Sequence, residues 1–144
     1  GGFWDVSKAD PVLSICMTCR DGRESEAGTR GGARLARRIA ARQMERGGPE
    51  MQIRGVHCMS QCKRPCIVSL TAEERFTYIF GVLDPNSERD AEALVELVSL
   101  YSEAAEGFLE RKERPTELRA NILGRLPPLG SQSSLISDLE LVKT

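Results

Sequence analysis

The 144-residue chain contains a single histidine, His57. One imidazole excludes two kinds of site that need two histidine ligands in one chain, the Rieske iron–sulfur centre and the two-cysteine, two-histidine zinc finger. An excess of charge of one sign is also missing, since 20 basic and 21 acidic residues give a formal net charge of -1. The composition therefore predicts neither nucleic-acid binding nor attraction to an anionic membrane.

Long apolar runs are missing too. None approaches the roughly 20 residues that a membrane-spanning helix needs, and no signal-peptide pattern of a basic start, an apolar stretch and a small-residue cleavage site is present. The five cysteines are an odd number, which fits a secreted disulfide framework poorly. We therefore expect a cytoplasmic protein, because clustered cysteines in a reducing compartment more often serve metal or redox chemistry.

The cysteines form two clusters, a C-x2-C and a C-x3-C-x3-C, and these hold most of the candidate chemistry of the chain. Soft thiolates that converge in a fold most often bind zinc or an iron–sulfur cluster. We expect four ligands with a fifth candidate thiol. The ligands are Cys16, Cys19, Cys58 and Cys62, and the fifth candidate is Cys66.

Three chemistries compete for these thiols. A [2Fe–2S] cluster needs four thiolates, and structural zinc would use the same four, or three of them with His57. Thiol–disulfide exchange by Cys16 and Cys19 is the third. In thioredoxin-type enzymes a C-x-x-C opens a helix, whose N-terminus lowers the pKa of the thiol, whereas here the Gly-rich loop 20–32 comes before the next helix.

Apolar periodicity predicts the element order β-α-β-β-β-α. The strands are expected over residues 12–15, 51–57, 67–70 and 77–83, and the helices over 33–46 and between Ser87 and Gly107, with a third, shorter helix over 115–126. Two parallel strands joined by a helical crossover, followed by a hairpin and a helix, form the core of the thioredoxin-like fold. The sequence therefore predicts an α/β, thioredoxin-like fold with a mixed four-stranded sheet and a C-terminal helical extension.

The domain organisation follows from this order. Residues 1–11 form an N-terminal arm, 12–107 the thioredoxin-like metal- or cluster-binding domain, 108–129 the C-terminal extension, and 130–144 a tail that we expect to be mobile. Because a βαβ unit puts the carboxyl ends of both strands at one edge of the sheet, this topology brings the two cysteine clusters together.

The second cluster carries a family resemblance. Cys58-Met-Ser-Gln-Cys62, followed by Lys-Arg-Pro-Cys-Ile-Val-Ser-Leu, resembles the thioredoxin-like [2Fe–2S] ferredoxins and the related small subunit of respiratory complex I. In that superfamily one ligand ends the first strand, and Cys16 or Cys19 matches it. A second ligand follows further along the loop there, but residues 20–32 contain no cysteine. The resemblance thus implies that the C-x-x-C partner or Cys66 takes that role.

A closer resemblance covers residues 12–128. The chain is similar to a bacterial family of predicted metal-binding proteins, often encoded near cobalt-handling and cobalamin-synthesis genes. The motifs that carry this resemblance are Cys-Met-Thr-Cys-Arg, Cys-Met-Ser-Gln-Cys-Lys-Arg-Pro-Cys, Thr-Tyr-Ile-Phe-Gly-Val-Leu-Asp-Pro, Glu-Arg-Pro-Thr-Glu-Leu-Arg and Leu-Pro-Pro. The family implies metal binding by thiolates.

These observations predict a ferredoxin-like one-electron carrier with a [2Fe–2S] cluster on cysteine thiolates and no catalytic residues, hence no enzyme. The alternative is a non-redox metal-binding or metal-delivery protein for zinc or cobalt, with a link to cobalamin metabolism. A thiol–disulfide oxidoreductase is the third interpretation.

We expect the chain to interact with a redox protein partner and with neither a nucleic acid nor a membrane. A homodimer is also possible from the sequence. Arginines recur at every fourth position of the predicted helix 33–46 and just before it, and such a stripe would attract an acidic partner. The arginines predicted to dock this partner are Arg30, Arg34, Arg38 and Arg42.

Overall fold

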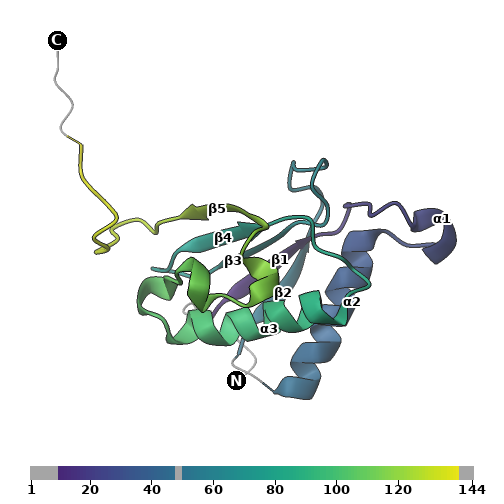
Figure 1. Cartoon of the computed structure of the whole chain (residues 1–144), viewed down its shortest axis with the longest axis horizontal. Coiled ribbons are helices and arrows are strands. Elements are labelled where there is room, and N and C mark those ends of the chain that lie inside the picture. The colour runs from purple at the N-terminus through teal and green to yellow at the C-terminus, as the bar shows by residue number, and fades with distance from the viewer. Residues whose placement is uncertain (1–9, 48–49, 140–144) are drawn as a thin grey trace, which may run out of the picture.

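The computed structural model describes residues 10–47 and 50–139 (Figure 1). Most of the predicted N-terminal arm and the last five residues of the predicted tail lie outside these ranges. The strands are β1 (Val12–Cys16), β2 (Gln52–Val56), β3 (Val68–Thr71), β4 (Thr77–Phe80) and β5 (Ile122–Leu126). The helices are α1 (Glu24–Ala27), α2 (Gly31–Arg46) and α3 (Glu88–Glu103), followed by short 3-10 turns at Ala105–Gly107, Arg111–Glu113 and Thr116–Leu118.

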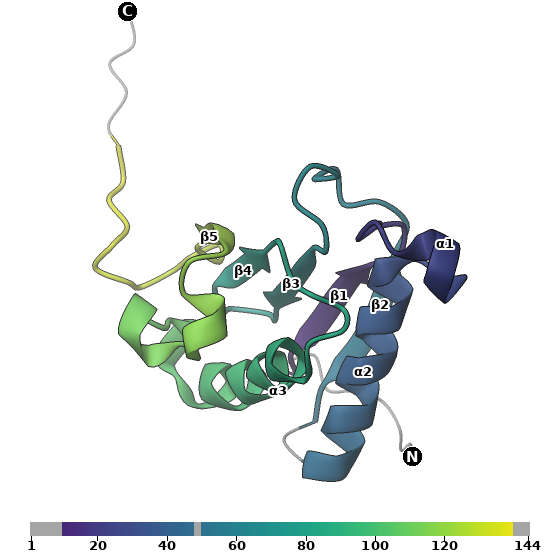
Figure 2. The ribbon, with the colours of Figure 1, turned by 45° about the vertical axis from the view of Figure 1, so that its right-hand side comes forward.

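The strands form one mixed sheet in the order β2-β1-β3-β4-β5. β1 and β2 are parallel, and the other neighbours pair antiparallel. The β1-α2-β2 crossover, the β3–β4 hairpin and α3 together make the thioredoxin-like arrangement, with α2 and α3 beside each other against the sheet (Figure 2). The predicted fold class is confirmed, with five strands in place of four.

The core lies between the sheet and these two helices. Alternate residues of the inner strands are fully buried, and the register places Leu13 opposite Leu70 and Ile15 opposite Val68. α2 contributes its buried stripe to this layer, and α3 contributes a longer one. Ser87 caps α3 as the sequence predicts, since its hydroxyl accepts a hydrogen bond from the Asp90 amide.

The predicted helix over 115–126 is wrong. That segment forms a single 3-10 turn and then β5, which pairs antiparallel with β4. Leu118, Ile122 and Leu126 are spaced like a helix stripe, but a short apolar pattern does not separate helix from strand. The free backbone groups along the edge of β4 offer hydrogen bonds that the sequence pattern does not display, and Gly124 disfavours a helix.

Two smaller features complete the description of the fold. The predicted loop 20–32 contains the one-turn helix α1. Within residues 10–47 and 50–139, no helix is both long and apolar enough to cross a membrane.

Candidate thiol site

The five cysteines lie around one edge of the sheet. Cys16 is the last residue of β1, and Cys58 follows the end of β2. β3 runs antiparallel to β1, so that Cys66, two residues before β3, lies at the same edge. The loop between β2 and β3 carries Cys58 and Cys62 and projects beyond the sheet (Figures 1 and 2).

Burial divides these thiols into two sets. Cys16, Cys19 and Cys66 are buried, with Cys66 fully enclosed, whereas Cys58 and Cys62 are exposed. All five are free thiols. The site therefore consists of a buried floor of three thiols beneath an exposed loop that carries two more.

Electrostatic interactions connect four of the five thiols. Burial raises the pKa of Cys19 to about 12, and its hydrogen bond with Cys16 and the charges of Cys16 and Cys62 add to this. Burial likewise raises the pKa of Cys66 to about 12, with further contributions from Cys19 and Asp21.

Cys16 behaves differently from the other buried thiols. Burial alone would raise its pKa, but hydrogen bonds from Thr18, Cys19 and the backbone of Met59 outweigh that effect and lower the pKa to about 7. Cys16 Sγ lies 3.5 Å from Thr18 Oγ1. Met59 belongs to the exposed loop. The hydrogen bond between its backbone and Cys16 therefore places this part of the loop against the end of β1.

Two adjacent glycines bring α2 against the thiols. A Cβ atom on Gly32 would lie 1.8 Å from the carbonyl oxygen of Cys16, and one on Gly31 would lie 3.1 Å from Cys66 Sγ. The Gly32 amide also donates to the carbonyl oxygen of Cys19, at 3.1 Å. The sequence prediction assigned both glycines to a loop, although adjacent glycines immediately before a helix indicate a close backbone approach.

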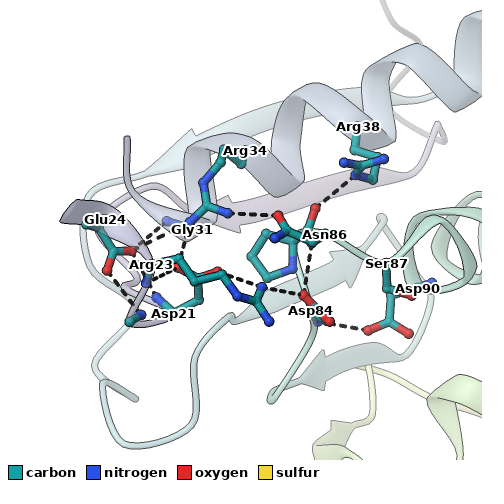
Figure 3. A network of polar contacts seen from close by, with 12 residues as sticks. Asp21, Arg23, Glu24, Gly31, Arg34, Arg38, Asp84, Asn86, Ser87 and Asp90 are labelled. Carbon is teal, nitrogen blue, oxygen red and sulfur yellow. Dashed lines mark hydrogen bonds and ion pairs between the residues drawn. The ribbon is translucent and has the colours of Figure 1, made fainter. Parts of the chain in front are cut away.

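A polar network fixes the segment that follows the C-x2-C motif (Figure 3). Arg34 of α2 donates to Asp21 Oδ1 at 2.5 Å and to Asn86 Oδ1 at 2.8 Å. Glu24 accepts hydrogen bonds from the amides of Asp21 and Gly31. The network thus joins the thiol segment, the start of α2 and the turn before α3. Sequence reasoning did not identify Asp21, Glu24 or Asn86, because their roles depend on contacts between distant segments.

Burial would raise the pKa of the Asp21 carboxyl, but the Arg34 guanidinium outweighs it and holds the pKa at about 2. Cys66 therefore has a fixed carboxylate and a fixed guanidinium in its surroundings. These two charges act on the pKa of Cys66 in opposite directions.

The four arginines of the predicted docking stripe all make contacts inside the chain. Arg30 donates to the Thr18 carbonyl, and Arg38 to the Pro85 carbonyl and Glu88. Arg34 belongs to the polar network, and Arg42 pairs with Glu45 and Glu92. Docking of a partner on this stripe stays a prediction.

The thiols are gathered at one edge without forming a closed ligand set. Across the described part of the chain, no group of three or more histidine, cysteine, aspartate or glutamate side chains is arranged to hold a metal ion. His57, the alternative zinc ligand, is exposed just after β2.

A known protein family covers the part of the chain that contains all five cysteines. The protein family DUF1636, described as a protein of unknown function, matches residues 13–128. The chain belongs to this family. No curated protein matches this DUF1636 chain.

Two solved structures resemble the DUF1636 chain. A thioredoxin-like [2Fe–2S] ferredoxin from Aquifex aeolicus is 16% identical, with a TM-score of 0.49, over 84% of this chain and 96% of the ferredoxin. A crystal structure of the wild-type thioredoxin-like [2Fe–2S] ferredoxin from the same organism is 13% identical, with a TM-score of 0.44, over 80% and 97% of the two chains.

Proposed function

We propose that this protein binds a [2Fe–2S] cluster on cysteine thiolates and acts as a one-electron carrier. The observation that supports this most is the gathering of five free thiols, three buried and two exposed, at a single edge of the sheet. Thiolates are the ligands that such clusters use, and a bound cluster supplies reversible one-electron exchange. The donor set therefore fits the group.

The residues at the site would perform two tasks. The buried floor of Cys16, Cys19 and Cys66 excludes water from one side of the site. The amide of Met59 and the hydroxyl of Thr18 stabilise negative charge on Cys16, as a ligand requires, because only the thiolate coordinates.

Three ligands are common to the two sets that we consider: Cys16, Cys19 and Cys62. The motif spacing favours Cys58 as the fourth, whereas burial and electrostatic interaction with Cys16 and Cys19 favour Cys66. We assign the fourth position to Cys66, and Cys58 to the exposed rim of the site.

The experiment that tests the function is anaerobic purification followed by an absorption spectrum and assays of iron, sulfide, zinc and cobalt on one sample. A brown protein with about two irons and two sulfides per chain supports the carrier. A colourless protein that keeps about one zinc or cobalt after cluster reconstitution contradicts the cluster and favours the second candidate, a non-redox metal-binding or metal-delivery protein.

Single serine variants test the ligand set. Cys66→Ser should lose most of the bound iron, because a serine hydroxyl does not replace the thiolate of an assigned ligand, and Cys58→Ser should retain it. Iron and sulfide are measured per folded chain, with circular dichroism as the control for folding. Loss of iron in Cys58→Ser and retention in Cys66→Ser would return the fourth position to Cys58.

The same variants address thiol–disulfide exchange. A Cys16→Ser variant that kept full disulfide reductase activity would remove that third interpretation, because exchange through the C-x2-C motif needs both thiols. If the protein is a one-electron carrier, the iron-loaded protein should not turn over disulfide substrates.

A further inference from the structure

The loop that projects beyond the thiols is basic and has no internal counter-charge. Between Glu50 and Glu73 the sequence contains no acidic residue, while it contains Lys63 and Arg64 within the loop. Both side chains are exposed, and so is Arg20, which follows Cys19. Among the described residues, none forms an ion pair with any of these three cations.

The acids on the same edge are already paired. Asp21 and Glu24 share Arg34, and Arg23 pairs with Asp21 and Asp84. These three carboxylates and two guanidinium groups leave one negative charge, which the cations of Arg20, Lys63 and Arg64 outweigh. The edge around the thiols is therefore positively charged although the whole chain carries a formal charge of -1.

An apolar side chain adjoins these cations. Val82 is 64% exposed, and its amide donates to the Arg64 carbonyl at 2.8 Å. Its φ of 55° is unusual for a β-branched residue. Cys58 and Ser60 in the same loop also have positive φ. Strained backbone persists where surrounding contacts determine it, and it concentrates at binding sites.

From these observations we infer that the thiol edge is the docking surface for an acidic protein partner, which contacts Arg20, Lys63 and Arg64 around Val82. Basic residues around an apolar contact are the pattern of a transient protein interface. The role of the partner rests on the proposed function, since it would exchange electrons with the cluster. A nucleic acid is disfavoured because residues 57–66 contain no phenylalanine, tyrosine or tryptophan for base stacking.

The basic helix α2 offers a matched control. Arg37 and Arg46 are exposed and have no ion-pair partner among the described residues, so that reversing them changes the net charge as much as reversing Lys63 and Arg64. The two double variants K63E/R64E and R37E/R46E differ only in where the charge is changed.

The test is an NMR titration of the reduced, metal-free full chain with a short oligoglutamate peptide that carries one central leucine. Amide shifts are expected in the loop 57–65 and at Arg20. At low salt, K63E/R64E should weaken binding about tenfold and R37E/R46E less than about twofold, with the difference vanishing at high salt. Val82→Ser should weaken binding by a smaller factor, and thermal unfolding checks that each variant folds.

Shifts that map to α2 would overturn the inference in favour of the arginine stripe. Equal losses in the two double variants would overturn it in favour of an unspecific effect of net charge. Tighter binding of an oligothymidylate of equal charge would overturn it in favour of a nucleic acid. Because the titration uses metal-free protein, its result is independent of the iron assay. An absence of iron would contradict the carrier and leave the docking surface standing.

Discussion

Gly32 allows the backbone of α2 to approach the thiol site closely. Any β-carbon there meets the Cys16 carbonyl, which belongs to a buried central strand that cannot move aside. Gly32→Ala should therefore lower the free energy of unfolding by about 3 kcal/mol, as overpacking of a rigid core does. Urea denaturation measures this change.

Gly124→Ala is the control for that substitution. Gly124 lies in β5, and its added β-carbon would have only two side-chain atoms nearby, at 3.9 and 4.0 Å. The free energy of unfolding should stay the same or rise slightly, because alanine restricts the unfolded chain. An equal loss in both variants would mean that the close approach at Gly32 is not the cause.

The carboxyl of Asp84 should make the stability of the fold depend on pH. The amide of Asn86 and the guanidinium of Arg23 lower the pKa of its carboxyl below the unfolded value of about 3.9. The folded state thus gains stability from Asp84 above that value and loses it as the pH falls through the folded pKa. Asp84→Asn should lose less stability between about pH 5 and pH 3 than the unchanged chain does.

Asp90 should show the opposite effect. Burial raises the pKa of its carboxyl, so that its contribution to stability grows as the pH falls through the folded pKa. Asp90→Asn removes this gain, and acid denaturation should become steeper. Urea midpoints at a series of pH values test both variants, and identical slopes would contradict both assignments.

At the scale of elements, the motif Glu-Arg-Pro-Thr-Glu-Leu-Arg organises the path from α3 to β5. Arg114 is 4% exposed, and its guanidinium donates to the carbonyls of Leu109, Leu118 and Arg119. Arg119 donates in turn to the carbonyls of Arg114 and Lys112. The motif thus stabilises a segment that has no long helix of its own.

Replacing the buried arginine should be costly. Arg114→Ala removes three hydrogen bonds, including the buried one to the Leu118 carbonyl, and should lower the free energy of unfolding by about 3 kcal/mol. Arg119→Ala, in a more exposed position, should cost about 1 kcal/mol. If the two variants lose the same free energy of unfolding in thermal or urea denaturation, the hydrogen bonds of the Arg114 guanidinium have no specific role.

The long elements could be predicted from the sequence because local pattern determines them. The apolar stripe and the Ser87 cap define α3, and the buried run Val12–Cys16 defines β1. β5 could not be predicted, since its strand character comes from the free edge of β4. α1 is too short to show a periodic pattern, and its position is fixed by the Glu24 carboxylate, which accepts a hydrogen bond from the distant Gly31 amide.

At the scale of the molecule, the topology brings the cysteines to one edge of the sheet. This convergence could be predicted from the order of the helices and strands. The sequence could not separate buried from exposed thiols, because the burial of Cys66 depends on the first turn of α2 lying against it. For the same reason the charges beside Cys66, on Asp21 and Arg34, could not be predicted from spacing.

Ligation of the thiols should stabilise the whole domain. A group that binds only the folded chain raises its stability by about 2.7 kcal/mol at a free concentration of 100 Kd. Zinc added to the reduced, iron-free chain should therefore raise the unfolding temperature, and Cys19→Ser should abolish the rise. An equal rise in Cys19→Ser would place zinc elsewhere on the protein.

The C-terminal segment leaves the fold far from the thiols. Ser131 and Gln132 donate to the carboxylate of Glu106, whose carbonyl accepts from the Phe76 amide at the turn between β3 and β4. That turn lies at the opposite end of β3 from Cys66. A protein tethered to a solid support through this C-terminal segment would therefore present the thiol edge to the solution, where added metal ions or a protein partner can reach it.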